Sequence, residues 1–156
     1  MSAATKDSDG KKVLLRNKRA RHDYHIDETW EAGIVLLGSE VKSLRAGKAE
    51  LTDAYASVRE GEAILHQMQI SEWAFANQFN HTPKRDRKLL LHRVEIKKID
   101  DATRKSGYTL IPLEVYLRNG KIKVLIGLGK GKKQFDKRED QREKDADRDI
   151  KRAMRK

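Results

Sequence analysis

The chain contains no cysteine and only two prolines among its 156 residues. Without cysteine it forms no disulfide and offers no thiolate ligand to a metal ion, which suits a reducing cytosol. No apolar run approaches the roughly 18 residues that a membrane-spanning helix requires. The N-terminal segment MSAATKDSDGKK lacks the apolar core of a signal peptide. We therefore expect a cytoplasmic protein with no membrane partner and a short disordered lead over residues 1–12.

Aromatic residues are also scarce, at 6% of the chain, which argues against a protein that stacks a long single strand of nucleic acid. Positive charge is abundant. Lys and Arg number 35 against 24 Asp and Glu, giving a net charge of +11. Such a balance favours a polyanionic partner, because each neutralised phosphate releases condensed counterions. Residues 130–156 contribute 12 positive and 7 negative side chains, so the rest of the chain is basic in its own right.

No arrangement of residues in the sequence indicates catalysis or a metal site. His22 and His25 would point to opposite faces of a strand, and no converging ligands lie near them. The run GLGKGKK, from Gly127, resembles a phosphate-binding loop but has Lys133 where that loop needs Ser or Thr. We expect these glycines to let the last strand leave the barrel. The sequence predicts no cofactor.

The first predicted elements are a strand and a short helix. Tyr24, Ile26 and Trp30 alternate before an apolar run at 34–37, which predicts a strand with a bulge or close backbone approach near Gly33. A helix then follows, capped by Ser39 and ended by Gly47. Its exposed side would carry three basic residues, Lys42, Arg45 and, just beyond the helix, Lys48.

Two hairpins and a longer helix complete the predicted body. One hairpin turns at Glu60–Gly61 and the other at Asn119–Gly120, a pair that suits a type I′ turn. Pro112 lacks a ladder donor, which predicts an edge or a bulge. Thr82–Pro83 resembles a helix start, and we expect a helix through KRDRKLLLHRVEIKKID. We therefore predict a mainly β fold: a small antiparallel OB-type β-barrel at residues 13–129, with two or three helices.

Charged side chains fall into groups that suggest a binding surface. Basic residues cluster at 18–21, 42–48, 84–88 and 130–133. On a small barrel such clusters can surround one face and read a folded RNA through phosphates and 2′-hydroxyls, although a merely solvated surface is the alternative. Glu31 lies in an apolar neighbourhood, beside Trp30. It is either a surface acid at a strand edge or a group that accepts hydrogen bonds from a partner.

At NKRARHDYHI and EAGIVLLGSEVKSLRAGKAELTDAYA the sequence resembles the SsrA-binding protein family, also called small protein B. NHTPKRDRKLLLH, GYTLIPLEVYLRNGKIKV and GKGKKQFDKRE match the family in the same order, so the resemblance covers residues 13–156. It implies an OB-type barrel that binds the tRNA-like domain of transfer-messenger RNA. Such a protein is no enzyme. It delivers that RNA to stalled 70S ribosomes for trans-translation, and we expect it to be a monomer.

The resemblance also implies roles for particular residues. The glutamate of EAG, the last leucine of RKLLL and a lysine after the NG turn are tied to RNA binding in the family, and correspond here to Glu31, Leu91 and Lys123. Further basic or polar residues in matching motifs are expected to join them: Arg19, Arg21, His22, Lys42, Arg45, Lys48, Lys130, Lys132 and Lys133.

The tail, residues 130–156, is 27 residues long and 19 of them are charged. We expect it to be disordered when free and helical on the ribosome, in the decoding centre and mRNA channel beside 16S rRNA. Ala146, Ile150 and Met154 belong to one narrow helical stripe. The residues expected to act there are Phe135, Asp136, Lys137, Arg138, Ile150 and Met154. Phe135 stands where relatives often have histidine, so it can stack but not hydrogen-bond.

Two other functions remain open at the level of the sequence. A permanent ribosomal protein with a basic extension would have a similar composition, and would be present on all ribosomes instead of stalled ones. A phosphate-handling enzyme built on GLGKGKK would have to hydrolyse nucleotides as pure protein.

Overall fold

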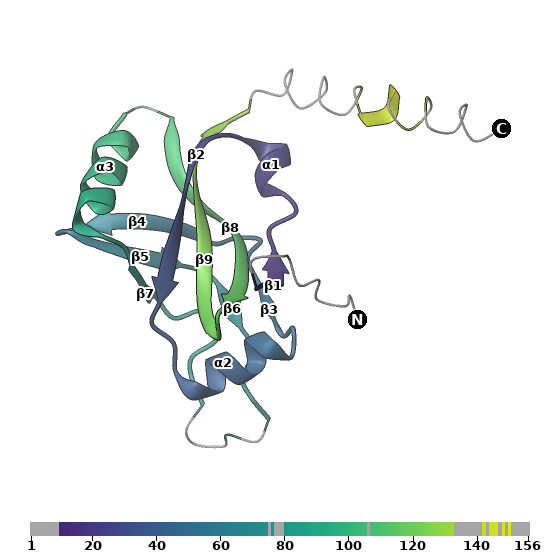
Figure 1. Ribbon diagram of the computed structural model, residues 1–156, viewed down its shortest axis with the longest axis vertical. Helices are drawn as coiled ribbons and strands as arrows, with labels where there is room; N and C mark the ends of the chain where they lie inside the picture. Colours follow the sequence, from purple (N-terminus) through teal and green to yellow (C-terminus); the bar gives the residue numbers. More distant parts are fainter. Residues whose placement is uncertain are drawn as a thin grey trace.

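The computed structural model describes residues 10–74, 76, 80–105 and 107–132, together with 142, 144–146, 148 and 150 near the C-terminus. Up to residue 132 the described part is mainly β (Figure 1). Its elements are, in order, β1 (Lys11–Arg16), α1 (Ala20–Asp23), β2 (Tyr24–Ile34), α2 (Gly38–Arg45), β3 (Ala49–Glu50), β4 (Tyr55–Arg59), β5 (Glu62–His66), β6 (Gln69–Ile70), β7 (Arg87–Leu90), α3 (Arg93–Thr103), β8 (Tyr108–Arg118) and β9 (Lys121–Gly131).

Every strand pair is antiparallel, and the main sheet has the order β1-β8-β4-β5-β7-β2-β9. Strand β9 also pairs with β8, so the pairings run around a ring. The ring of strand pairings is weakest between β4 and β8, which pair only through Ala56 and Leu110. The predicted antiparallel OB-type fold is therefore confirmed, as a barrel that is not strictly closed. Strands β3 and β6 pair separately.

Both predicted hairpins are confirmed. Asn119 and Gly120 have φ angles of 51° and 77°, as a type I′ turn requires, and Glu60 and Gly61 have 53° and 75°. The register of β8 against β9 shifts between Pro112 and Glu114. Pro112 thus lies beside a bulge, as predicted for a residue that has no N–H to donate to the ladder.

Strand β2 differs from its prediction in one detail. It continues through Gly33 without interruption, and its bulge lies earlier, between Ile26 and Glu28. The close approach predicted at Gly33 is present, because a Cβ atom there would lie 3.1 Å from the Cβ of Leu90.

The single helix predicted after Pro83 is wrong, because the segment forms the strand β7 and then the helix α3. Burial in β7 alternates with a period of two: Arg87 and Leu89 are buried, while Lys88 and Leu90 are exposed. The helix begins only after His92, whose N–H donates to the Glu95 carboxylate at 3.1 Å.

The cap predicted for α2 is also wrong. The helix begins at Gly38, and the residue before it, Leu37, donates its N–H to the Glu40 carboxylate at 2.8 Å. Ser39 lies in the first turn and its hydroxyl contacts the buried ring of His81. The predicted end is confirmed, since Gly47 has φ +73°.

Two apolar clusters hold the barrel together. The main core fills its interior and includes Trp30, Leu65 and Ile126. A smaller core, in which Ala20 packs with Ile111 and Leu113, lies between α1 and the outer side of β8. The barrel extends two residues beyond the predicted bounds at each end, since β1 begins at Lys11 and β9 ends at Gly131.

Candidate nucleic-acid interface

Glu31 lies on the outer side of β2, between the buried side chains of Trp30 and Ala32. Its carboxylate accepts a hydrogen bond from the Tyr116 hydroxyl and forms an ion pair with Arg118 Nη1 at 3.1 Å. The side chains of Glu31 and Arg118 are 33% and 35% exposed. The carboxylate is therefore held in place and partly open to solvent, which is what an acceptor for a partner needs.

Tyr116 is only 2% exposed, although it points away from the main core. Two cations cover its ring: Lys11 Nζ lies 4.4 Å from the ring centroid and the Arg118 guanidinium carbon 5.5 Å. Burial, together with the carboxylate of Glu31, raises the pKa of Tyr116 well above its ordinary value. The hydroxyl consequently keeps its proton and remains a donor to Glu31.

Strand β1 extends this arrangement. Lys11 Nζ lies 3.3 Å from Glu114 Oε1, and Arg16 Nε lies 3.6 Å from Glu114 Oε2. Glu31, Tyr116, Arg118, Lys11 and Glu114 thus form one connected group, here called the Tyr116 network. Of these five residues only Glu31 is predicted from the sequence. Its partners come from β8 and β1, and only the strand register brings them together.

Lys123 of β9 and Leu90, the last residue of β7, lie beside Gly33, two positions after Glu31 on β2. Gly33 of β2 pairs with Lys123 on one side and with Leu90 on the other. Leu90 is 52% exposed, whereas Leu91 is half-buried and packs against the main core. The leucine accessible beside Lys123 and Glu31 is therefore Leu90, one position before the residue chosen from the sequence.

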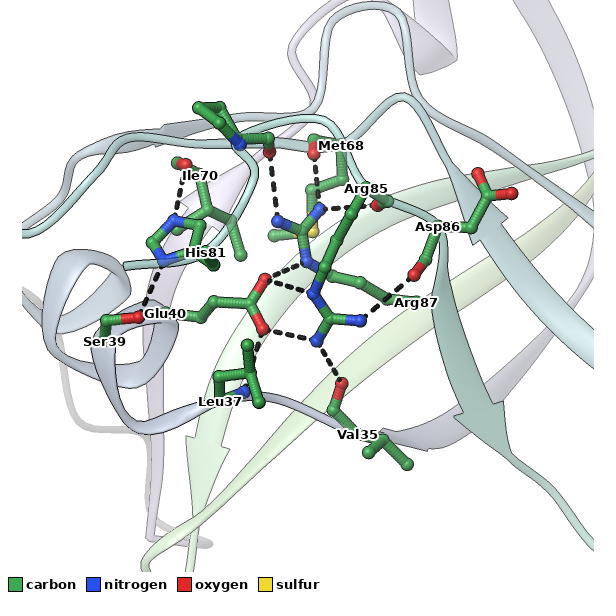
Figure 2. Close-up of polar contacts among 11 residues, drawn as sticks. Val35, Leu37, Ser39, Glu40, Met68, Ile70, His81, Arg85, Asp86 and Arg87 are labelled. Carbon is green, nitrogen blue, oxygen red and sulfur yellow. Dashed lines mark hydrogen bonds and ion pairs between the residues drawn. The ribbon is translucent and has the colours of Figure 1, made fainter. Parts of the chain in front are cut away.

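The helix α2 is fixed by a buried ion pair, and Figure 2 shows its contacts. Glu40 and Arg87 both have side chains that are 0% exposed. The Glu40 carboxylate accepts hydrogen bonds from Arg85 and Arg87, and Arg87 donates further to the carbonyl oxygens of Met68 and Pro83, at 2.6 and 3.0 Å. These contacts join α2 to β7 and to the loop before it.

The protonation of Glu40 follows from these contacts. Burial alone would raise the pKa of Glu40, but hydrogen bonds from Arg85, from the Leu37 N–H and from Arg87 outweigh burial and hold the pKa below its ordinary value. Nearby, Ser39 Oγ lies 2.8 Å from His81 Nδ1, and His81 Nε2 lies 2.8 Å from the Ile70 carbonyl oxygen. Both interactions position α2, whose residues Lys42 and Arg45, with Lys48 after the helix, are exposed as predicted.

The remaining predicted basic residues lie around α1. Arg19, Arg21 and His22 are exposed, and His22 Nδ1 lies 2.9 Å from Asp23 Oδ1. The end of β9 is beside them: the Lys132 N–H donates to the Asp23 carbonyl at 2.9 Å, and exposed Lys130 pairs with His25. Helices α1 and α2 lie at opposite ends of the barrel in Figure 1. The described basic residues at α1 and at α2 therefore form two surfaces instead of surrounding one face.

The glycines of GLGKGKK have a packing role. A Cβ on Gly127 would lie 3.0 Å from a methyl group of Leu113, and one on Gly129 would lie 3.0 Å from a methyl group of Ile111. Both glycines lie within β9 and leave room for the smaller core beneath α1. The sequence had predicted that these glycines let the last strand leave the barrel, and this prediction is wrong, because both lie inside the strand.

Several predicted residues lie outside the described residues: Lys133, Phe135, Asp136, Lys137, Arg138 and Met154. In the tail, residues 142, 144–146, 148 and 150 have helical geometry, and Ile150 is 54% exposed. Within the described ranges no group of three or more metal-ligating side chains gathers, and no helix is long and apolar enough to cross a membrane.

The fold and these surfaces define the class of protein: it is a small basic protein built on an OB-type barrel. The strand face and loops of this fold bind oligonucleotides. The family model described as SmpB protein matches residues 14–156. This chain belongs to the SmpB protein family.

Curated relatives and a solved structure agree with this assignment. The chain is 56% identical over 144 residues to the SsrA-binding proteins of Bacillus pumilus and Bacillus subtilis, covering 92% of each chain in both comparisons. It is 53% identical over 146 residues to that of Thermobifida fusca, covering 94% of this chain and 91% of the relative. A solved structure described as "tmRNA-SmpB: a journey to the center of the bacterial ribosome" is similar at 47% identity and a TM-score of 0.66. The match covers 77% of this chain and 85% of that one.

Proposed function

We propose that this protein binds the tRNA-like domain of transfer-messenger RNA and delivers that RNA to stalled ribosomes for trans-translation. It acts as a binding protein and catalyses no reaction. The observation that carries the proposal is membership of the SmpB family over residues 14–156, joined to a similar solved structure in which tmRNA and SmpB are found with the ribosome.

The Tyr116 network supplies a physical basis for RNA binding at one surface. Glu31 is fixed by Tyr116 and Arg118, and accepts hydrogen bonds from a 2′-hydroxyl or a base edge. Lys123, with Lys42, Arg45 and Lys48 at α2, neutralises phosphates around that contact. Leu90, or Leu91 beside it, packs on a sugar or a base. The second surface, with Arg19, Arg21, His22, Lys130 and Lys132, provides a separate set of phosphate contacts.

The tail acts on the ribosome in this proposal. It occupies the decoding centre and the mRNA channel, where 16S rRNA phosphates face its 12 basic side chains. Ile150 is exposed and does not pack into the barrel, so its apolar surface is available to a partner. We place the protein in the cytoplasm, where ribosomes translate.

One experiment tests the partner directly. The protein is purified from cells under conditions that preserve RNA, and the bound RNA is sequenced. The proposal expects transfer-messenger RNA to be enriched over ribosomal RNA and tRNA. Equal recovery of ribosomal RNA from all ribosomes, with no enrichment of transfer-messenger RNA, would instead favour a permanent ribosomal protein with a basic extension.

A further inference from the structure

A groove of about 360 Å³ lies between α1, the segment before β4, and β8. This volume is within the range of clefts that hold small molecules, about 300–1,000 Å³. Its walls are mostly polar and include Arg19, Asp53, Thr52 and Tyr55. The groove shares no lining residue with the Tyr116 network or with α2, and of the basic residues on the second surface only Arg19 contributes to its lining.

The groove has a fixed floor. Asn17, which lines it, donates its side-chain amide to the Pro112 carbonyl oxygen at 3.0 Å and to the Leu51 carbonyl oxygen at 3.4 Å. The Asn17 N–H donates to the Leu113 carbonyl oxygen at 2.8 Å. The segment before α1 is therefore tied to β8 and to the segment before β4, so the groove is formed before any ligand binds.

Tyr55 provides an aromatic surface at this groove. Its ring stacks on His66, with centroids 4.9 Å apart and planes at 28°, yet the residue is 47% exposed. His66 thus covers part of the ring, while the residue as a whole remains largely accessible and contributes to the lining of the groove. An exposed aromatic ring held in place is the feature on which nucleobases stack.

His66 is itself held on both nitrogens. Ser57 Oγ lies 2.7 Å from Nε2, and Asp86 Oδ1 lies 2.9 Å from Nδ1. The order of atoms is that of a nucleophile triad, but the Asp86 side chain is 63% exposed and the ring of Tyr55 lies on the imidazole. A triad carboxylate is normally buried. The group therefore serves as a support that fixes the orientation of Tyr55.

Charged groups at the groove suit the other parts of a nucleotide. Arg19 is exposed and forms no ion pair with another described residue, so its guanidinium can contact a phosphate. Asp53 is likewise exposed and lies in the same lining. A carboxylate accepts two parallel hydrogen bonds from the N1–H and the amino group of guanine, whereas no other RNA base offers that pair of donors.

We propose that this groove binds one unpaired guanine nucleotide of an RNA strand. The base stacks on Tyr55, its Watson–Crick edge faces Asp53, and its phosphate contacts Arg19. This inference rests on the proposed RNA-binding function and extends it to a second, base-specific site.

The test uses the full chain and three single-stranded RNA pentamers, UUGUU, UUAUU and UUUUU, with binding followed by fluorescence anisotropy. We expect UUGUU to bind about tenfold more tightly than the other two, and GMP, but not AMP, to compete. Tyr55→Ala should lose about that factor, and Tyr55→Phe should retain binding. Asp53→Asn should remove the preference for guanine, while Asp101→Asn, an exposed change on α3, should keep it.

Equal binding of the three pentamers, or unchanged binding by a folded Tyr55→Ala variant, would overturn the inference. Thermal melting shows whether each variant folds. The same preparations are tested with a tRNA-like RNA. If wild-type protein binds that RNA but shows no preference among the pentamers, the groove proposal fails while the proposed function stands. If it binds neither, both fail.

Discussion

At the scale of single residues, the Tyr116 network turns an exposed acid into a defined acceptor. A free carboxylate on a basic surface would repel RNA and would have many orientations. Glu31 instead has one oxygen engaged by Tyr116 and Arg118, and the rest of its carboxylate remains partly open. The arrangement offsets local repulsion with Arg118 and Lys11 while keeping a hydrogen-bond acceptor in a fixed place.

The first prediction concerns Glu31→Gln. The variant keeps an oxygen that accepts from Tyr116 but loses the charge facing Arg118. We expect specific binding to a tRNA-like RNA to weaken by about 1–3 kcal/mol, while binding to an unrelated RNA stays equal or increases because Arg118 is released. Filter binding with both RNAs measures the ratio. The melting temperature should change little, since the side chain is 33% exposed.

Glu62→Gln is the matched control, because Glu62 is an exposed acid paired with Lys88 at 3.2 Å and lies outside the network. A large loss of stability in Glu31→Gln, with binding lost in proportion, would contradict a role in binding and show that Glu31 is only structural.

The second prediction concerns Lys123→Gln. A lysine that contacts phosphate contributes the same free energy whatever the sequence, so binding should weaken alike for all RNAs tested. The slope of log Kd against log salt should fall by about 1. Lys97→Gln, an exposed change on α3, is the control and should leave the slope as it is. An unchanged slope in Lys123→Gln would exclude a phosphate contact there.

At the scale of elements, a buried ion pair positions α2. The pKa of Glu40 is lower in the folded protein than its ordinary value of 4.5. The charged carboxylate therefore stabilises the fold fully at pH values above that ordinary pKa. This stabilisation is lost as the pH falls through the folded pKa. Glu40→Gln should lower the free energy of unfolding at pH 7 by about 3–5 kcal/mol, since Arg87 remains buried without its partner.

Urea unfolding at pH 7, 5, 4 and 3 measures this third prediction. Between pH 5 and 3 the free energy of unfolding should fall more steeply in the wild type than in Glu40→Gln. Asp101→Gln, which alters an exposed acid of α3, should keep the wild-type slope. Parallel slopes for wild type and Glu40→Gln would contradict the assigned protonation.

The fourth prediction concerns the glycines of β9. A methyl group on Gly127 would lie 3.0 Å from Leu113, so Gly127→Ala should lower the free energy of unfolding by about 1–3 kcal/mol. Gly131→Ala is the control, because nothing lies within 4 Å of the added atom. Thermal melting compares the two. Equal stability of both variants would contradict the packing role assigned to Gly127.

The elements also show which parts of the fold are readable from the sequence. A hairpin is determined by residues that are neighbours in the sequence, and the pairs Glu60–Gly61 and Asn119–Gly120 predict their turns directly. Strand β7, in contrast, depends on a residue far away in the sequence. Arg87 and Leu89 alternate with exposed neighbours, but the reason for burying an arginine is Glu40, 47 residues earlier in the chain. A helical pattern read from the segment alone missed that partner.

The candidate site follows the same rule. Glu31 was singled out by its apolar neighbours and then by resemblance to a family, and Lys123 by that resemblance alone. Tyr116, Arg118 and Lys11 become visible only when the register of β1, β8 and β9 is known. Leu91 was chosen through the same resemblance, as the last leucine of RKLLL, and sequence order alone does not show which leucine faces outward. Alternation along β7, once the strand is recognised, places Leu90 outside.

At the scale of the whole molecule, the account divides the chain into a barrel that binds RNA and a tail that acts on the ribosome. The barrel extends through Gly131, and the Lys132 N–H still contacts α1. A truncation that tests this division must therefore be made after Lys132, because an earlier cut removes the Lys132 contact with α1 or part of β9 as well.

The central claim is tested most directly by reconstituted peptide tagging on ribosomes stalled at the end of a message, with binding to transfer-messenger RNA measured in parallel. The account predicts that protein truncated after Lys132 still binds this RNA within a few-fold of the full chain but supports no tagging. Replacing Ile150 and Met154 together by Asp should nearly abolish tagging, whereas replacing Asp145 and Asp147 by Asn should change it little. Full tagging by the truncated protein would contradict the account.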